Sequence, residues 1–468
     1  MVRFYLIIII YLVILSGCVN NPETNRNLES LNASLLVKHQ QYSLNIARRN
    51  PVSTNHWWAR FNDPLLNQLL KEALENSPTV QIAAERVDKA KKIANEVGSA
   101  LWPSLNLNAT VVRQRFSQFG LAPPPFNGRT FNIGQVGLNF NYEIDFWNKN
   151  RQALAAKVSE HYAAKADLDA ARLIISTAVA NTYFLLKKNL YQYHLAQEAL
   201  IQRQKMVTII KYRVKHGLDS DIPLENVLAD IQQYQLQLEF YRQAETMSRH
   251  KLAMLMGKNP LTTDIVVDGF VYKKYYVNLP SNIPANVLAK RPDIAASRLR
   301  IESAAHEINV AKARFFPNIN LMALFSYQSL GLGHLFDVQS QNNYGGPAID
   351  LPIFDAGARR ANLGVKNAEY DIALSSYNQT ILTALREVAD QAIILNSLNS
   401  QVLAQTHELR AIEENYKLIY ARYTHGITGY TSVLQSKDAV LKQRSKQVEY
   451  QGRQLIALVD MIKALGGD

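Results

Sequence analysis

The chain has 468 residues, 47% of them hydrophobic, and its 20 glycines and 16 prolines are too few for a low-complexity chain or a turn-rich all-β sandwich. A single cysteine excludes a disulfide framework and a cysteine-based zinc site within one chain. The formal net charge is +12, but Lys and Arg are scattered rather than gathered into a basic stripe, so the composition does not favour nucleic-acid binding.

The amino terminus carries a processing signal. Arg3 is followed by twelve apolar residues, Phe4 to Leu15, which are too few to span a bilayer as a helix and are typical of a signal-peptide core. The run leads into Leu15-Ser16-Gly17-Cys18, which resembles the lipobox of bacterial lipoproteins. In a lipobox the cysteine receives a diacylglyceryl group and an N-acyl chain. We predict a lipoprotein signal peptide over 1–17 and a lipidated segment over 18–62. The alternative is an ordinary signal peptide followed by an incidental cysteine.

An internal repeat organises the rest of the chain. Four short markers recur in the same order, 208 to 214 residues apart: they surround Pro103 and Pro317, Phe146 and Phe354, Gly217 and Gly426, and Gly257 and Gly466. The markers predict a first repeat over 63–257, an equatorial linker over 258–291 and a second repeat over 292–468.

Each repeat has the same predicted plan, a helix followed by two strands. The first helices are expected over 63–101 and 292–316, each with a proline in its first turn. Apolar and polar residues then alternate over 105–111, 136–144 and 319–327, a pattern typical of strands with one apolar face. A fourth strand, around 348–354, is less clear because Pro347 and Pro352 interrupt it. The segments 118–128 and 329–343 are expected to be loops.

Long helices follow the strands. Residues 150–216 contain neither Pro nor Gly, and only Gly364 interrupts 358–425. Helices of this length extend for about 100 Å. Shorter helices are predicted to return over 222–256 and 430–465, and steps of three and four between apolar residues favour coiled-coil packing. We expect the linker to be irregular, with a short β-like run at 265–267.

Four amphipathic strands cannot close a barrel, because small barrels need about eight strands and a membrane-spanning sheet has no open edge. We therefore predict a mainly α-helical protein with a transmembrane β-barrel, in which three chains contribute twelve strands above a tube of paired long helices.

Six motifs carry a resemblance to a known family. They are Trp57-Trp58-Ala-Arg-Phe-Asn-Asp63-Pro64, Tyr142-Glu-Ile-Asp-Phe-Trp147, Arg291-Pro-Asp-Ile294, Phe315-Phe-Pro-Asn-Ile-Asn-Leu321, Leu351-Pro-Ile-Phe-Asp-Ala-Gly357 and Ala464-Leu-Gly-Gly467. Together the motifs resemble the TolC-like outer-membrane factors, in the lipoprotein branch of efflux outer-membrane proteins.

The resemblance implies a homotrimer in the bacterial outer membrane, anchored by lipid and extending into the periplasm. Such a duct takes drugs or other small molecules from an inner-membrane pump through a periplasmic adaptor (membrane fusion) protein. It performs no covalent chemistry and needs no cofactor. Two alternatives stay open, a periplasmic coiled-coil adaptor or scaffold lipoprotein and the outer-membrane duct of a type I protein secretion system.

An enzyme or a metal site is not indicated. His306-Glu307 and His407-Glu408 lack the second histidine of a zinc-binding HExxH motif, and Gly257-Lys258 lacks the rest of a phosphate-binding loop. We therefore assign no catalytic residue and no metal ligand.

By the same resemblance, the two turns between long helices meet the adaptor. The candidate contact residues are Arg213, Gly217, Ser220, Asp221, Arg422, Gly426 and Gly429. The simpler interpretation is that the glycines only end helices, which needs no partner.

The resemblance also indicates a gate near the second turn. Relatives often place a ring of acidic side chains there, but this chain has Ser432 and Gln435 at those positions and Asp438 one helical turn farther on. Tyr423 matches a family tyrosine that helps to hold the mouth closed. Our hypothesis is that closure depends on contacts near Tyr423, Asp221 and Gln435, with Asp438 as the nearest acidic ring.

Lipidation can be tested at its sole acceptor. We expect Cys18→Ser to abolish labelling by a radioactive or clickable fatty acid and to slow outer-membrane assembly, because one membrane attachment is lost while the strands can still insert. Labelled acyl chain remaining on the variant would contradict the lipobox assignment.

Overall fold

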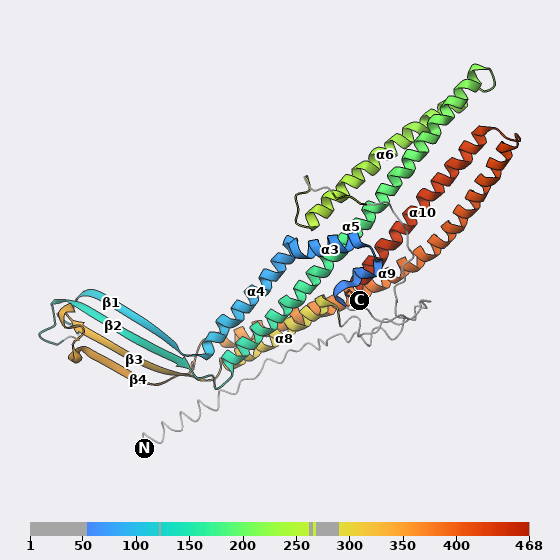
Figure 1. The fold of residues 1–468 in the computed structure, drawn as a ribbon. Helices are drawn as coiled ribbons and strands as arrows, with labels where there is room; N and C mark the ends of the chain where they lie inside the picture. The colour runs from blue at the N-terminus through green and yellow to red at the C-terminus, as the bar shows by residue number, and fades with distance from the viewer. Residues whose placement is uncertain (1–53, 121–122, 262–264, 268–289, 468) are drawn as a thin grey trace, which may run out of the picture. The chain divides into compact units, whose positions relative to one another are not determined.

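The computed structural model describes residues 54–120, 123–261, 265–267 and 290–467 (Figure 1). The predicted signal peptide, Cys18 and most of the linker lie outside these residues. The chain divides into two compact units. The described residues of one lie within Lys92–Glu160 and Arg300–Ser376, and those of the other within Leu31–Lys91, His161–Leu299 and Tyr377–Asp468. Each unit therefore draws residues from both repeats.

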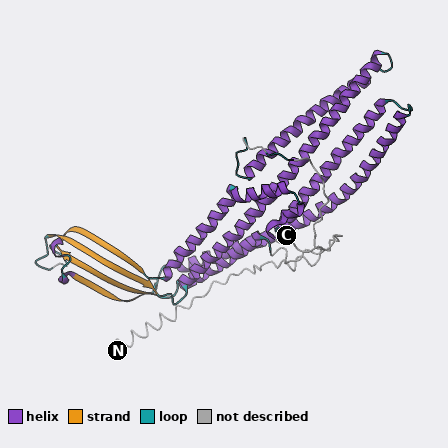
Figure 2. Cartoon of the chain, in the orientation of Figure 1, coloured by secondary structure: helices purple, strands orange, loops and turns teal. Residues whose placement is uncertain are grey.

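Helices dominate the described residues (Figure 2). Two of them, α5 and α9, have 67 residues each, which confirms the predicted long helices. Each is followed by a shorter helix, α6 or α10, and we call α5–α6 the first helical hairpin and α9–α10 the second. The bounds are η1 Thr54–Phe61, α3 Pro64–Asn76, α4 Pro78–Gly98, α5 Lys149–Lys215, α6 Ile222–Leu255, α8 Pro292–Ala313, α9 Ala358–Thr424 and α10 Tyr430–Ala464.

Two of the predicted helices have other bounds in the structure, and one predicted β-like run is not a strand. The helix predicted over 63–101 is broken into α3 and α4, because Ser77 is extended (φ −63°, ψ 124°) before Pro78, and a residue before proline disfavours the helical region. The first helix of the second repeat ends at Ala313 rather than at 316. Residues 265–267 form no strand; Ile265 instead packs its side chain into the helical core.

The four strands form one antiparallel sheet in the order β1-β2-β3-β4. Leu107 lies opposite Leu138, which lies opposite Phe325, whereas Asn106 lies opposite Asn139. The register thus gathers the alternating apolar residues on one face, as predicted. The bounds are β1 Ser104–Arg115, β2 Thr130–Glu143, β3 Asn318–Leu330 and β4 Gln341–Asp350.

The fourth strand begins earlier than predicted and ends at Asp350, so 351–354 are not part of it. Pro347 lies inside this strand, opposite Leu321. A proline has no N–H to donate, and an edge strand tolerates it because only one of its sides is paired. The predicted loop before β4 contains two short turns of helix, η3 Leu332–His334 and η4 Val338–Ser340.

The sheet has a close contact on its polar face and bare side chains on its apolar face. On the polar face, a Cβ atom at Gly137 would lie 2.4 Å from the Cβ of Ser326, so only glycine fits opposite this serine. Ser326 is buried and donates a hydrogen bond from its hydroxyl to the Asn342 carbonyl at 2.7 Å. Leu105 and Phe325, on the apolar face, are each more than 60% exposed. In a water-soluble sheet the apolar face is the covered one, so the large apolar side chains left bare here are the reverse of that pattern.

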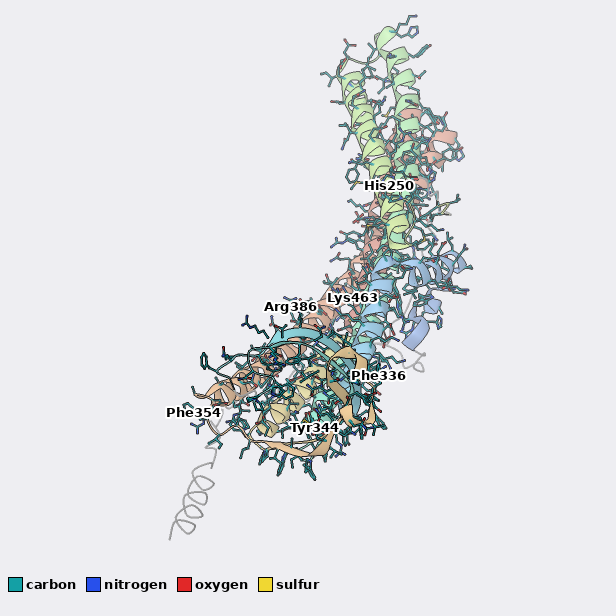
Figure 3. All side chains as sticks on the ribbon, turned by 90° about the vertical axis from the view of Figure 1, so that its left-hand side faces the viewer. His250, Phe336, Tyr344, Phe354, Arg386 and Lys463 are labelled. Carbon is teal, nitrogen blue, oxygen red and sulfur yellow. The ribbon has the colours of Figure 1, made fainter. Side chains whose placement is uncertain are left out.

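Large aromatic side chains also stand exposed in the unit that contains the sheet. Phe336 and Tyr344 lie in the strand region and Phe354 follows β4 (Figure 3). Near the other ends of the strands, Trp147 stacks on Phe316 with ring centroids 4.6 Å apart and donates its indole N–H to the Pro317 carbonyl. Two of the six family-like motifs therefore meet in space.

Most of the buried core lies in the helical unit, where further motif residues are structural. Trp57 and Phe61 are buried among the helices. Asp63 caps α3 by accepting the Leu66 N–H, and it also accepts hydrogen bonds from the Tyr183 hydroxyl (2.8 Å) and the Lys187 ammonium (3.2 Å). Burial would raise the pKa of this carboxyl, but these three donors lower it on balance.

A search of the described helices finds none with the combination of length and hydropathy that crossing a bilayer requires.

The exposed apolar face can be tested with paired arginine substitutions on β2. An arginine on a lipid-facing strand costs about 2–4 kcal/mol at the bilayer midplane. We therefore expect Leu138→Arg, on the apolar face, to impair outer-membrane assembly far more than Asn139→Arg on the polar face. The yield of folded protein in isolated outer membranes measures the effect. Equal yields from the two variants would contradict a lipid-facing role.

Candidate functional site at the helical turns

The turn between α5 and α6 is built by a glycine in the left-handed region. Gly217 has φ +69°, its N–H binds the Val214 carbonyl (3.0 Å), and the Leu218 N–H binds the Arg213 carbonyl (2.8 Å). These two hydrogen bonds form the Schellman motif, which satisfies the last carbonyls of a helix. A Cβ atom at Gly217 would meet no atom within 4 Å, so backbone conformation and not space favours glycine here.

The turn between α9 and α10 has the same construction. Gly426 has φ +72°, its N–H binds the Tyr423 carbonyl (2.9 Å), and the Ile427 N–H binds the Arg422 carbonyl (2.9 Å). The helix ends at Gly257 and Gly466 repeat the pattern once more. The predicted role of Gly217 and Gly426 in the tight turns is therefore confirmed.

The first turn is further closed by an ion pair. The Arg213 guanidinium lies 2.6 Å from one oxygen of Asp219 and 3.4 Å from the other. The hydrogen bond and the charge of Asp219 raise the pKa of Arg213, and the same hydrogen bond lowers the pKa of Asp219. Arg213 therefore braces the turn from within, in addition to any contact with a partner.

The remaining predicted contact residues lie on the surface of the two turns. Ser220, Asp221, Arg422 and Gly429 are all exposed; Asp221 precedes α6 and Gly429 precedes α10. Apolar side chains stand exposed beside them, with Leu218 at 60%, Ile222 at 71% and Ile427 at 63%. A pair of turns that presents both apolar and polar groups suits a protein partner better than a small ligand.

The predicted gate tyrosine belongs to a row of aromatic rings. Tyr423 lies 6.5 Å from Tyr420 and 5.3 Å from Tyr430 between ring centroids, and Tyr420 lies 6.2 Å from Tyr416. The row joins the end of α9 to the start of α10. Tyr423 thus packs within its own hairpin, while Asp221 belongs to the other one.

Ser432 and Gln435 occupy the first turns of α10. Ser432 is half-buried, and its hydroxyl accepts a hydrogen bond from Thr428 at 3.2 Å. Gln435 is exposed. Of these two gate candidates, Gln435 is therefore the one whose side chain is free to face a lumen.

The structure does not support Asp438 as an acidic ring. Its side chain is only 6% exposed and is bound by Arg203 at 2.6 Å, the Tyr234 hydroxyl at 2.8 Å and Lys442 at 3.2 Å. A carboxylate that is buried and neutralised in this way does not offer its charge to passing ions. The expectation that Asp438 would supply the nearest acidic charge is corrected by these contacts.

The sequence interpretation missed Arg203 and Tyr234, which approach Asp438 from α5 and α6. A signal was present, because Arg203 follows Ala199 and precedes Met206 along a buried stripe, and Asp438 stands between Leu434 and Leu441 in the same way. A charged residue within an apolar helical stripe indicates a buried partner. Single-chain periodicity does not identify that partner.

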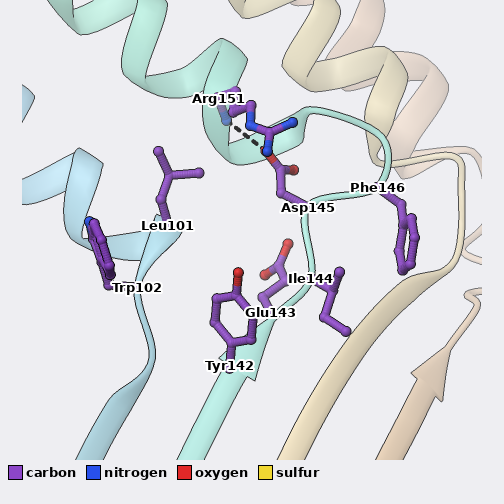
Figure 4. A pocket seen from close by; sticks show the side chains of 8 residues that line it. All are labelled: Leu101, Trp102, Tyr142, Glu143, Ile144, Asp145, Phe146 and Arg151. Carbon is purple, nitrogen blue, oxygen red and sulfur yellow. Dashed lines mark hydrogen bonds between the residues drawn. The ribbon is translucent and has the colours of Figure 1, made fainter.

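Near the strand ends, two related carboxylates start the long helices. At the beginning of α5, Asp145 accepts the backbone N–H of Arg151 (Figure 4) and also that of Asn150. At the beginning of α9, Asp355 accepts the backbone N–H of Arg359. Such caps bind the first N–H groups of a helix and favour its positive end. The hollow drawn in Figure 4 also contains Glu143, which pairs with Lys149 at 2.5 Å. Its acids are thus engaged in structural contacts.

Within the described ranges, no group of three or more His, Cys, Asp or Glu side chains is placed to hold a metal ion.

Comparisons with known proteins agree with this architecture. The family model for outer membrane efflux proteins matches residues 69–258 and 283–467. The multidrug resistance outer membrane protein MdtQ of Escherichia coli O157:H7 is 27% identical over 464 residues, covering 97% of this chain and 96% of MdtQ.

Solved structures show the same fold. The outer membrane protein VceC of Vibrio cholerae is 31% identical and superposes with a TM-score of 0.77, covering 89% of this chain and 99% of VceC. The CmeC outer membrane channel of Campylobacter jejuni superposes with a TM-score of 0.83 at 23% identity, covering 96% of this chain and 94% of CmeC. These similarities confirm the predicted fold class, outer-membrane location and efflux-channel function. The chain belongs to the outer membrane efflux protein family.

Proposed function

We propose that three copies of this chain form the passive outer-membrane duct of a tripartite efflux system. The duct carries drugs or other small molecules that an inner-membrane pump delivers through a periplasmic adaptor. It has no catalytic residues of its own and needs no cofactor, in keeping with relatives that are channel proteins. A diacylglyceryl and N-acyl lipid on Cys18 anchors each copy in the membrane.

The observation that carries the proposal is the open four-stranded sheet. β1 and β4 stand at its two edges, and each is paired on one side only among the described strands. In hydrocarbon an unpaired edge leaves a row of N–H and C=O groups without partners, at several kcal/mol per group. Pairing β1 of one copy with β4 of the next satisfies both edges. Three copies then close a ring of twelve strands.

The faces of the sheet support the same arrangement. In a closed ring the bare apolar face, with Leu105 and Phe325, lies against lipid, and the polar face with Asn139 lines the interior. A periplasmic adaptor or scaffold would give such an apolar face nothing to contact. The type I secretion alternative has the same duct architecture, and it differs in cargo rather than in any feature of the sheet.

The two helical turns support docking to a partner protein. Each turn ends a hairpin of long helices and exposes an apolar side chain after its glycine, Leu218 in the first and Ile427 in the second. Three copies present six such turns. We propose that the adaptor binds these turns, with Arg422 and Asp221 among the polar contacts.

The edge pairing can be tested by disulfide trapping. Asn108→Cys on β1 is combined in turn with Asn342→Cys, Tyr344→Cys and Gly346→Cys on β4, all on the polar face of the sheet. We expect at least one pair to produce covalent dimers and trimers in outer membranes after mild oxidation. The matched control, Asn108→Cys with Asn320→Cys on the inner strand β3, should stay monomeric on denaturing gels. Covalent species from the control but from none of the β4 pairs would refute the ring.

The ion selectivity of the mouth gives a second test. Gln435→Asp places three carboxylates near the axis of the trimer, where the low dielectric of a constriction strengthens their attraction for cations. We expect the reversal potential in a salt gradient to shift toward cation selectivity in planar bilayers. The control is Gln235→Asp, at an exposed glutamine on α6. No shift with Gln435→Asp, or an equal shift with the control, would place the constriction elsewhere.

The same recordings examine closure. Tyr423→Phe keeps the ring that packs against Tyr430 and removes only the hydroxyl, and Asp221→Ala removes the exposed carboxylate before α6. If hydrogen bonds from these groups hold the mouth closed, both variants should raise the resting conductance. Unchanged conductance in both would show that the closing contacts lie elsewhere.

A further inference from the structure

The two helical hairpins are joined along one seam, where α5 and α10 run antiparallel. Polar pairs cross this seam at successive levels. They are Asn181 with Asp460 (2.7 Å), Lys188 with Glu449 (2.9 Å), Gln192 with Ser445 (2.6 Å), Glu198 with Lys437 (3.0 Å) and Arg203 with Asp438 (2.6 Å). The last pair is the one nearest to the turns.

The Arg203–Asp438 pair differs from the other charged pairs of the seam in burial. Its side chains are 10% and 6% exposed, whereas Glu449 and Glu198 are more than 40% exposed. Both oxygens of Asp438 are bound, one by Arg203 and the other by the Tyr234 hydroxyl. Burial and the charge of Asp438 raise the pKa of Tyr234, which therefore stays a proton donor.

The cluster also includes α6. Arg203 reaches Asp230 at 3.2 Å, and Lys442 reaches Asp438 at 3.2 Å, so two cations face two carboxylates. Together, Arg203, Asp230, Tyr234, Asp438 and Lys442 form what we call the Asp438 cluster. It ties α10 to both helices of the first hairpin.

The Asp438 cluster separates two apolar regions of very different size. Ala199 and Leu441, on the side away from the turns, belong to the large core of the helical unit. Met206 and Leu434, on the side of the turns, belong to a small group with Ile210 and Val227. Leu434 is the only member of this small group that comes from the second hairpin.

Closer to the turns, the contacts already described lie within one hairpin or the other. Arg213 binds Asp219 in the first, and Tyr423 packs on Tyr430 in the second. The apolar attachment between the hairpins thus changes at the Asp438 cluster, from the large core to a small group in which Leu434 is the residue from the second hairpin.

We infer that Asp438 is a positioning residue whose cluster fixes the point beyond which the two hairpin turns can part. On the turn side, α10 leaves the first hairpin by withdrawing Leu434; on the other side, the large core keeps α10 in place. The inference rests on the proposed function, because parting of the turns is what would widen a duct at its periplasmic mouth. It assigns Asp438 to control of opening and not to ion selection.

The chemistry of a buried ion pair makes this role testable. Removing one partner leaves the other charge buried and uncompensated, which is strongly unfavourable, whereas replacing both by apolar residues is often neutral. Asp438→Asn should therefore release α10 locally. The double variant Arg203→Met with Asp438→Leu should hold it again. A carboxylate that acted by its charge on ions would not be replaceable by leucine.

The experiment measures alkylation of a cysteine by a membrane-impermeant maleimide, on the full-length protein in isolated outer membranes. Leu434→Cys reports the turn side of the cluster and Leu441→Cys the core side; both leucines are no more than 3% exposed. The parent chain gives the background rate, because its one cysteine, Cys18, is blocked by lipid in the proposed protein. In the Asp438→Asn background we expect the Leu434→Cys rate to rise about tenfold or more, and the Leu441→Cys rate to stay within about twofold.

One control variant and one second test variant complete the experiment. Glu449→Gln breaks the half-exposed pair with Lys188 in the same seam and should leave both rates within about twofold of the parent. Tyr234→Phe removes one hydrogen bond but keeps the ring, so it tests the cluster even where Asp438→Asn does not assemble; an increase of about threefold at Leu434→Cys is expected.

Three results of the alkylation experiment would overturn the inference. They are an unchanged Leu434→Cys rate in both Asp438→Asn and Tyr234→Phe, equal increases at Leu434→Cys and Leu441→Cys, and a double apolar variant as reactive as Asp438→Asn. Bilayer recordings separate this inference from the proposed function. A protein that conducts no ions would contradict the duct without affecting the alkylation result. A shift in reversal potential with Asp438→Asn would contradict the assignment to opening.

Discussion

The backbone groups at the two edges of the four-stranded sheet must find hydrogen-bond partners, and this requirement shapes the whole protein. A sheet with open edges and a bare apolar face is stable neither in water nor in lipid by itself. The repeat supplies two strands from each half of the chain, and β2 pairs with β3 across the halves, but β1 and β4 are each paired on one side only among the described strands. In the proposed ring these two edges pair with other copies, and the number of copies then also sets the number of helical hairpins.

A few hydrogen-bonding residues fix where each long helix begins and where it ends. Asp145 and Asp355 bind the first N–H groups of α5 and α9, so that each long helix starts at a defined point after its strand. At the other end, Gly217 and Gly426 reverse the chain with the same two hydrogen bonds. A fixed starting point matters for a helix of 67 residues, because a small change in direction at its first turn becomes a large displacement at its far end.

The charged pairs between the two hairpins differ in burial, and this difference is the basis of the inferred parting of the turns. Half-exposed pairs such as Lys188 with Glu449 contribute little to stability, and the large apolar core supplies most of the cohesion. A buried cluster around Asp438 is different, since its members must stay together or leave charges unpaired. The Asp438 cluster lies between the large apolar core and the small apolar group. On the core side α10 packs against many residues, and in the small group its member is Leu434.

Much of the architecture followed from periodicity alone. Alternation with period two gave the faces of β1, β2 and β3, because side chains on a strand point alternately to opposite sides. The near-absence of Pro and Gly, with Gly364 the one exception, indicated the two long helices, and the glycines that follow them indicated the turns. Periodicity was weakest where proline intervenes, at the break before Pro78 and in β4, because proline can start an element or be tolerated inside an edge strand.

In the candidate site, too, some features could be predicted from the sequence and others could not. The turn glycines could be identified from the sequence, since the requirement for a positive φ is local to the residue itself. The fate of Asp438 could not, because its charge is cancelled by Arg203, 235 residues earlier in the chain, and by Tyr234 on a third helix. The repeat, most of the secondary structure and the family could thus be predicted from the sequence. The burial of particular charges could not, since it depends on how separate helices pack and not on the period of any one of them.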